Sequence, residues 1–321
     1  MKKLFLTAGV LTFVGTVPMA VADGPIDGKV YGKVNVSVVN ADTNSGDAWE
    51  LNSNASRIGF KGATEISDSL EVFYQAEFEI CVDDGDCKGQ TFKQRNIMGG
   101  IRGNFGSVFA GKHDSPTKMA GKPVDLFNDL EGDIKNAFEG ENRLSNIVAY
   151  STPKVNGFKA TVAMIPAENK DVDGDGAKDT GLADGVSYSL TYKANDLYVA
   201  VAGDQDVDGQ DLLRIVSQYK INALKLGAMY QQNEKNDGSL DESGYFFSAA
   251  YKVDQITYKA QFGSIEDDRD GDEEETLSLG ADYKLAKNTK AFVFYTDNSD
   301  SSVDGSQSDE TSFGIGLEHK F

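Results

Sequence analysis

The sequence has no long apolar run beyond its first 22 residues. A helix needs about 20 consecutive apolar residues to cross a bilayer, so a helical membrane protein is excluded. Basic residues are also scarce, with 31 Lys and Arg residues against 51 Asp and Glu residues. This deficit argues against nucleic-acid binding, which requires basic patches.

The first 22 residues have a pattern of their own. Two lysines precede an apolar stretch, Leu4–Val17, and the small residues Ala20-Val21-Ala22 follow it. A basic region, a short apolar region and an A-x-A site are typical of a secretory signal peptide, whereas a transmembrane helix would be longer. We expect residues 1–22 to be removed. The mature chain, residues 23–321, then has 29 basic and 51 acidic residues and a formal net charge of −22.

Cysteine and histidine occur only twice each. Cys81 and Cys87 lie close together, and in an exported protein the default for such a pair is a disulfide that closes a small loop. Metal binding by two thiols is the weaker alternative. His113 precedes Asp114 and Ser115, but neighbours in sequence do not make a catalytic triad. We therefore expect neither an enzyme nor a cofactor.

Alternation with a period of two is abundant. The chain ends with every second residue from Phe313 to Phe321 apolar or aromatic except His319, and with small or polar residues between them. This pattern indicates a strand with one apolar face. About sixteen strand-like segments recur, the second spanning Leu51–Gly62, and no linker divides them. The sequence therefore predicts a single all-β domain.

The connections between these segments alternate in length. Gly103–Gly106 and Ala194–Asp196 are short, whereas Cys81–Gln90, Asp114–Arg143 and Asp204–Asp211 are longer, polar loops. Short turns on one rim and long loops on the other are typical of an outer-membrane barrel, and a secreted β-sandwich does not require them. In lipid every strand edge must be paired, so the first strand must meet the last. We predict a 16-stranded antiparallel transmembrane β-barrel in the bacterial outer membrane.

Three short segments carry a resemblance to a known family. Val30–Lys33, Ser56–Gly62 and Gly103–Val108, together with the terminal Phe, are similar to Gram-negative general porins. The similarity spans the mature chain and is strongest up to Pro153. It implies a homotrimer of barrels whose third long loop, here Asp114–Arg143, folds into the lumen and narrows the pore. The loop has Pro123-Val124-Asp125-Leu126-Phe127 where some porins have Pro-Glu-Phe-Gly-Gly, which is a departure from the family pattern.

Charged residues of this loop and of the facing wall are the candidate constriction. The loop supplies Asp125, Asp129, Glu131 and Asp133. Parity places Arg57 and Lys61 inward, since Ile58 and Phe60 suit the lipid face. The resemblance implies that Lys33, Arg57, Arg95 and Arg143 form a basic cluster opposite the acids, and Lys112 is a further candidate. Acids that face bases create a transverse field and a selectivity filter.

One acidic loop resembles the start of a calcium site. Asp171, Asp173, Asp175 and Asp179 offer oxygens at alternating positions, but Leu182 stands where a bidentate glutamate would complete the site. Calcium in this external loop and a solvated acidic turn are the two alternatives. Divalent cations at such loops also bridge lipopolysaccharide.

The sequence therefore predicts a passive, water-filled channel for ions and small hydrophilic solutes. Its acidic loops predict a preference for cations, moderated by the internal bases. A sugar-specific porin is the alternative, and it would need aromatic platforms along the constriction. The single tryptophan, Trp49, precedes the second strand, and we expect Phe127 and Phe138 to pack against the wall. The expected partners are two further copies of the chain, outer-membrane lipid and lipopolysaccharide.

Overall fold

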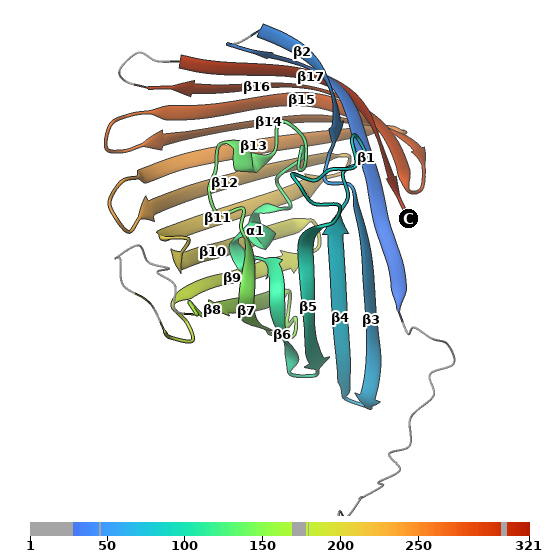
Figure 1. The fold of residues 1–321 in the computed structure, drawn as a ribbon, viewed down its shortest axis with the longest axis vertical. Helices are drawn as coiled ribbons and strands as arrows, with labels where there is room; N and C mark the ends of the chain where they lie inside the picture. The colour runs from blue at the N-terminus through green and yellow to red at the C-terminus, as the bar shows by residue number, and fades with distance from the viewer. Residues whose placement is uncertain (1–27, 45, 169–177, 179, 303–306) are drawn as a thin grey trace, which may run out of the picture.

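The computed structural model describes residues 28–44, 46–168, 178, 180–302 and 307–321, which form a closed antiparallel β-barrel (Figure 1). The first strand, β1 (Lys29–Thr43), pairs with the last, β17 (Gln307–Lys320), from Lys33 opposite Lys320 to Thr43 opposite Glu310. This pairing leaves no open edge. No helix among the described residues is long and apolar enough to cross a membrane. The predicted signal peptide lies outside the described residues.

The wall has sixteen strand positions, as predicted, because β2 (Gly46–Ser53) and β3 (Arg57–Ser67) share the second and both pair with β1. The remaining strands are β4 (Leu70–Glu79), β5 (Lys93–Gly103), β6 (Gly106–Asp114), β7 (Arg143–Ser151), β8 (Phe158–Ile165), β9 (Gly185–Ala194), β10 (Leu197–Val207), β11 (Gln210–Ile221), β12 (Leu224–Lys235), β13 (Asp241–Val253), β14 (Ile256–Asp267), β15 (Glu273–Ala286) and β16 (Thr289–Ser301).

The division of the second strand was not predicted. Ala55 has a φ of 47°, in the left-handed region, so the ladder is interrupted there. The side chain of Ser56 replaces the lost contacts: its Oγ accepts from Asn35 N at 2.9 Å and donates to Asn35 O at 3.1 Å. An irregularity of this kind bends a strand and redirects the side chain that follows it. That side chain is Arg57, whose Nε donates to Ala55 O at 2.9 Å.

Several strands extend further outward than predicted. The segment Asp204–Asp211 was predicted to be a loop, but β10 continues to Val207 and β11 begins at Gln210. Beyond the lipid belt both faces of a strand meet water, so the apolar alternation disappears while the backbone pairing continues. The prediction therefore ended strands where the membrane ends.

Side chains divide by parity between lipid and lumen. Phe247, Leu279 and Ile315 are exposed on the outer face, whereas Ser248, Ser278 and Ser312 on the inner face are buried. This apolar-out, polar-in alternation is the pattern of a membrane barrel. His319 shares the outward parity of Ile315 and is exposed.

The long segment between β6 and β7 folds inside the barrel (Figure 1). We call residues 115–142 the constriction loop. It contains a short helix, α1 (Pro116–Gly121), which begins where Lys118 N donates to the Ser115 side chain at 3.0 Å, and a 3-10 turn, Ile134–Asn136. The helix lies against β9 and β10 of the wall, and the main apolar contacts of the lumen lie between this loop and the wall.

Candidate pore constriction

Apolar side chains pack one side of the constriction loop against the wall. Val124, Ile134 and Phe138 are almost fully buried in a cluster with residues of β10 to β14, and Phe127 packs against Phe292 and Phe294 of β16. Burying such side chains contributes about 1.5–3 kcal/mol each. The wall residue beneath Phe127 must be glycine, because a Cβ on Gly280 would lie 2.9 Å from the ring. Packing of Phe127 and Phe138 against the wall was predicted correctly.

A fully buried arginine ties the two ends of the loop together. Arg214 of β11 has no solvent exposure and pairs with Glu141 at 2.6 Å. The same nitrogen, Nη1, also donates to Thr117 O at 3.4 Å. Nη2 donates to Glu139 O at 2.6 Å, and Nε donates to the side-chain oxygen of Gln231 at 2.9 Å. One side chain of the wall therefore holds both the start and the end of the loop.

A second polar anchor holds the middle of the loop. Lys259 of β14 donates to Leu126 O at 3.1 Å and pairs with Asp282 of β15 at 3.0 Å. Gln261, two residues further on, accepts from Leu126 N at 3.0 Å and donates to Gly132 O. These contacts give the loop backbone the hydrogen bonds that it needs once it is removed from water.

The tip of the loop meets the wall through charges. Asp129 has a φ of 68°, which turns its carboxylate toward Lys33 of β1 at 2.7 Å and Arg57 of β3 at 2.6 Å. Burial alone would raise the pKa of Asp129, but these two cations outweigh it and hold the pKa at about 2. The carboxylate is therefore ionised throughout the physiological range.

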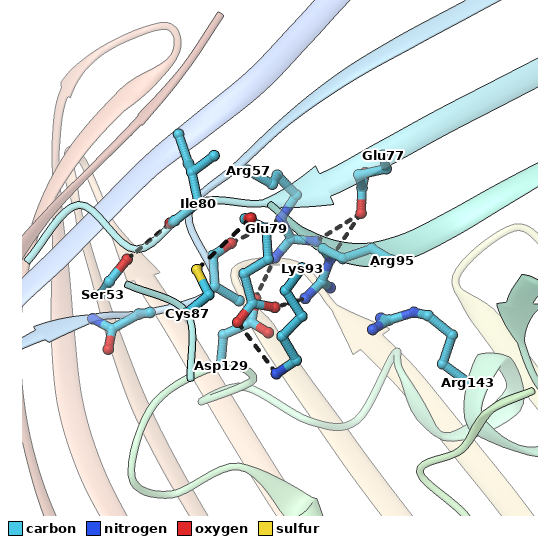
Figure 2. A network of polar contacts seen from close by, with 12 residues as sticks. Ser53, Arg57, Glu77, Glu79, Ile80, Cys87, Lys93, Arg95, Asp129 and Arg143 are labelled. Atoms are coloured by element: carbon cyan, nitrogen blue, oxygen red, sulfur yellow. Dashed lines mark hydrogen bonds and ion pairs between the residues drawn. The ribbon is translucent and has the colours of Figure 1, made fainter. Parts of the chain in front are cut away.

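The neighbouring cations of the wall have acidic partners of their own (Figure 2). Arg95 of β5 pairs with Glu77 at 2.9 Å and with Glu79 at 2.8 Å, both on β4, and Arg57 lies 3.6 Å from Glu77. These glutamates were missed by the sequence analysis. Parity could have found them, because both glutamates lie on the inward face of β4 and Phe78, between them, has the opposite parity.

The remaining predicted cations occupy different positions. Arg143 pairs with Asp114 at 2.9 Å. Both Arg143 and Lys61 line a cavity beside the constriction loop, and Lys61 Nζ lies 4.7 Å from the centre of the Tyr31 ring. Lys112 shares the parity of the outward-facing Val108 on β6, donates to the side chain of Ser145 and is not among the residues that line the cavity. Lys112 is therefore a residue of the wall on β6, which ends at Asp114.

The four predicted loop acids also differ in their surroundings. Burial, with Asp133 and Glu141 nearby, raises the pKa of Asp125 well above its usual range. Asp133 stabilises the turn, since it accepts from Asp129 N at 2.8 Å and from Lys135 N at 3.1 Å. Glu131 accepts from Asn52 of β2 at 2.8 Å and does not line the cavity. Of the four, Asp129 is the one that pairs with wall cations.

The space left beside the loop is a cavity of about 540 Å³. In the described part of the chain its lining has eight basic and seven acidic side chains, and its one aromatic residue is Tyr31. The lining residues that the sequence analysis did not select include Lys93, Lys118, Lys122, Lys135, Glu77, Glu79 and Glu141. The direction of a side chain in a loop depends on how the loop folds in the lumen. A loop has no regular alternation, so the sequence does not predict which of its residues line the cavity.

Two further predictions concern the cysteines and the acidic external loop. Cys81 and Cys87 form the predicted disulfide. The candidate calcium ligands Asp171, Asp173, Asp175 and Asp179 lie outside the described residues, and no group of three or more His, Cys, Asp or Glu residues elsewhere in the described chain could hold a metal.

A closed barrel with a loop folded into a charged lumen defines a pore-forming outer-membrane protein. The chain belongs to the Gram-negative porin family, since the model of that family matches residues 7–304. It is therefore a porin channel of the bacterial outer membrane.

Relatives agree over the whole length. The chain is 25% identical over 364 residues to outer membrane porin protein 32 of Delftia acidovorans and 26% identical over 355 residues to major outer membrane protein P.IB of Neisseria meningitidis serogroup B, with all of each chain covered.

Solved structures share the fold. An anion-selective porin from Comamonas acidovorans has a TM-score of 0.77 at 18% identity, with 92% of this chain and 99% of that chain covered. The trimer form of OmpT from Vibrio cholerae has a TM-score of 0.67 at 16% identity, with 92% and 99% covered.

Proposed function

We propose that the protein is a general diffusion pore whose selectivity is set by the charged cavity beside the constriction loop. The observation that supports this most directly is the contact of Asp129 with Lys33 and Arg57 at the edge of that cavity. Opposite charges held close together in a narrow passage orient water and polar solutes. Solutes move down their own gradients, and no bond is made or broken.

We further propose a preference for cations that weakens as salt is added. The outer loops carry a large excess of acids, and their attraction acts over a distance of about 10 Å in 0.1 M salt but only about 3 Å in 1 M salt. The cavity itself has one more base than acid, and burial raises the pKa of Asp125, one of those acids. In concentrated salt the cavity dominates, so the preference should approach or pass neutrality. The anion-selective porin of similar fold is compatible with such a balance.

The assembly that we propose is a homotrimer in outer-membrane lipid and lipopolysaccharide. Support comes from the similar fold of the trimer form of OmpT. A sugar-specific channel is less well supported, because Trp49 is exposed and Phe127 and Phe138 are buried against the wall.

Planar-bilayer recording of the purified protein tests these proposals. In about 1 M salt we expect large current steps that close in thirds. In about 0.1 M salt we expect the reversal potential under a salt gradient to indicate a preference for cations over anions. Added maltooligosaccharides should leave the current unchanged. Sugar-dependent blocking would instead favour a specific channel, anion preference in dilute salt would contradict the role of the outer acids, and absence of conductance would contradict the pore itself.

A further inference from the structure

The inner wall has opposite charges at its two ends. On β13, β15 and β16 an acidic residue near the outer loops and a lysine near the short turns lie ten residues apart on the same strand. The three pairs are Glu242 with Lys252, Glu274 with Lys284, and Asp300 with Lys290.

All three pairs have the parity of the lumen. On β13 the residues between Glu242 and Lys252 that share their parity include the buried Phe246 and Ser248, whereas Tyr245 and Phe247 are exposed to the outside. The same alternation holds on β15 and β16, where Thr276 and Phe294 are buried on the inner face. Both ends of each pair therefore belong to the face that surrounds the pore.

Neighbouring strands place like charges directly opposite each other. Glu274 is opposite Asp300 at the outer end of β15 and β16, and Lys284 is opposite Lys290 at the other end of the same two strands. Lys220 of β11 is likewise opposite Lys225 of β12. Such pairs destabilise a sheet. Pairs of like charge, which lower stability, occur at both the outer and the inner ends of these strands. This indicates that the charges serve a purpose other than stability.

The lysine end is only partly neutralised. Lys290 pairs with Asp282 at 2.9 Å. Lys220, Lys225, Lys252 and Lys284 have no ion pair with any residue in the described part of the chain. We call these four residues the lysine rim, and Glu242, Glu274 and Asp300 the acidic rim. Because short turns face the periplasm in outer-membrane barrels, the lysine rim lies at the periplasmic mouth.

The two rims are too far apart to cancel. Ten residues at about 3.3 Å each, tilted by about 40°, separate them by ~25 Å along the pore axis. The Debye length in 0.1 M salt is about 10 Å, so each rim controls the ions of its own mouth. Cations accumulate at the acidic rim and anions at the lysine rim.

We infer that the pore rectifies ionic current. When the outside is positive, cations enter from the cation-rich mouth and anions from the anion-rich mouth, so both accumulate in the pore and conductance rises. When the outside is negative, each ion must enter through the mouth that repels it, and the middle of the pore is depleted. This inference rests on the proposed diffusion function, and it adds a direction to the passive flow.

Single-channel current–voltage curves in symmetric salt test the inference. Single trimers avoid the cancellation of opposite insertions, and the side from which spermine lowers the current identifies the acidic mouth. In about 0.1 M KCl we expect at least ~1.5-fold more current when that mouth is positive, and a nearly symmetric curve in about 1 M KCl. A symmetric curve in dilute salt would overturn the inference while leaving the pore intact, whereas absence of current would overturn the diffusion function itself.

Two sets of variants separate charge from structure. Replacing the lysine rim by glutamine should bring the current ratio close to one and increase cation preference. Replacing the acidic rim (Glu242→Gln, Glu274→Gln, Asp300→Asn) should also lower the ratio, but should shift selectivity toward anions. Arginine at the four lysine positions is the matched control, because it keeps the charge and should keep the ratio. If the arginine and glutamine variants behave alike, the rim does not act through its charge and the inference is wrong.

Discussion

The constriction loop contacts the barrel in two different ways. Toward β10 to β16 it is held by buried apolar side chains and by Arg214 and Lys259, none of which is accessible to a passing solute to any large extent. Toward β1 and β3 the tip of the loop is held by ion pairs of Asp129 that border the charged cavity, while Val39 of β1 belongs to the apolar cluster around Phe127. The first side determines where the loop lies, and the second determines which charges a solute meets. Position and selectivity should therefore respond to different substitutions.

Removal of the buried arginine should have the largest effect on position. In Arg214→Met the carboxylate of Glu141 keeps only Lys118 at 3.8 Å, Glu139 O keeps only the Gln231 side chain at 3.2 Å, and Thr117 O loses its contact with the arginine. Breaking a buried ion pair in this way costs about 3–5 kcal/mol. We expect a lower free energy of unfolding in urea and an open channel whose current fluctuates between levels.

The double variant Arg214→Met, Glu141→Gln is the control for this prediction. It removes the uncompensated charge and should recover part of the lost stability. A quiet, fully stable Arg214→Met channel would show that apolar packing alone holds the loop.

The apolar contact at the middle of the loop comes next. Phe127 is completely buried over Gly280. We expect Phe127→Ala to lower the free energy of unfolding by about 3–5 kcal/mol, and by less where the loop relaxes into the space left by the ring. We expect increased current noise at unchanged ion selectivity. Phe247→Ala on the lipid face is the matched control and should leave the noise as it is. A change of selectivity without noise would contradict the division between the two sides.

Residues on both sides of the loop, the buried side against the wall and the charged side at the cavity, were predicted in part from the sequence. Parity along strands correctly oriented Arg57 and Lys61, and the apolar residues of the loop correctly indicated contact with the wall. Arg214 was missed although it interrupts the apolar inner face of β11 between Leu212 and Val216. Its role depends on backbone oxygens of a loop about 75 to 97 residues away, and the sequence contains no sign of that contact.

Selectivity should depend most on the tip of the loop. Asp129→Asn removes the nearest carboxylate of Lys33 and Arg57, which keep only Glu318 at 3.7 Å and Glu77 at 3.6 Å. A unit charge at about 4 Å in a water-like medium is worth roughly 1 kcal/mol, or ~5-fold in the ratio of cation to anion permeability. Asp125→Asn is the matched control on the same loop. Asp125 makes no ion pair with a cation in the described part of the chain, and its Oδ1 accepts from Phe127 N at 3.3 Å within the loop, so the substitution should change the ratio much less. Equal effects of the two substitutions would contradict this assignment.

The smallest effect that we expect in the physiological range is a change of ion selectivity with pH caused by Asp129 at the tip of the loop. The pKa of Asp129 is lowered from its ordinary value of 3.8 to about 2. Its contribution to stability is therefore fully present above pH 3.8 and is lost as the pH falls through about 2.

Any other group that changes its charge with pH shifts the reversal potential of wild type and of the variant alike. The difference between wild type and Asp129→Asn removes this shared shift. That difference should stay constant from neutral pH down to about pH 4 and vanish only near pH 2. If it already vanishes near pH 4, Asp129 titrates as an ordinary solvated acid. The ion pairs with Lys33 and Arg57 would then be too weak to order the tip, and both sides of the loop would depend on apolar packing.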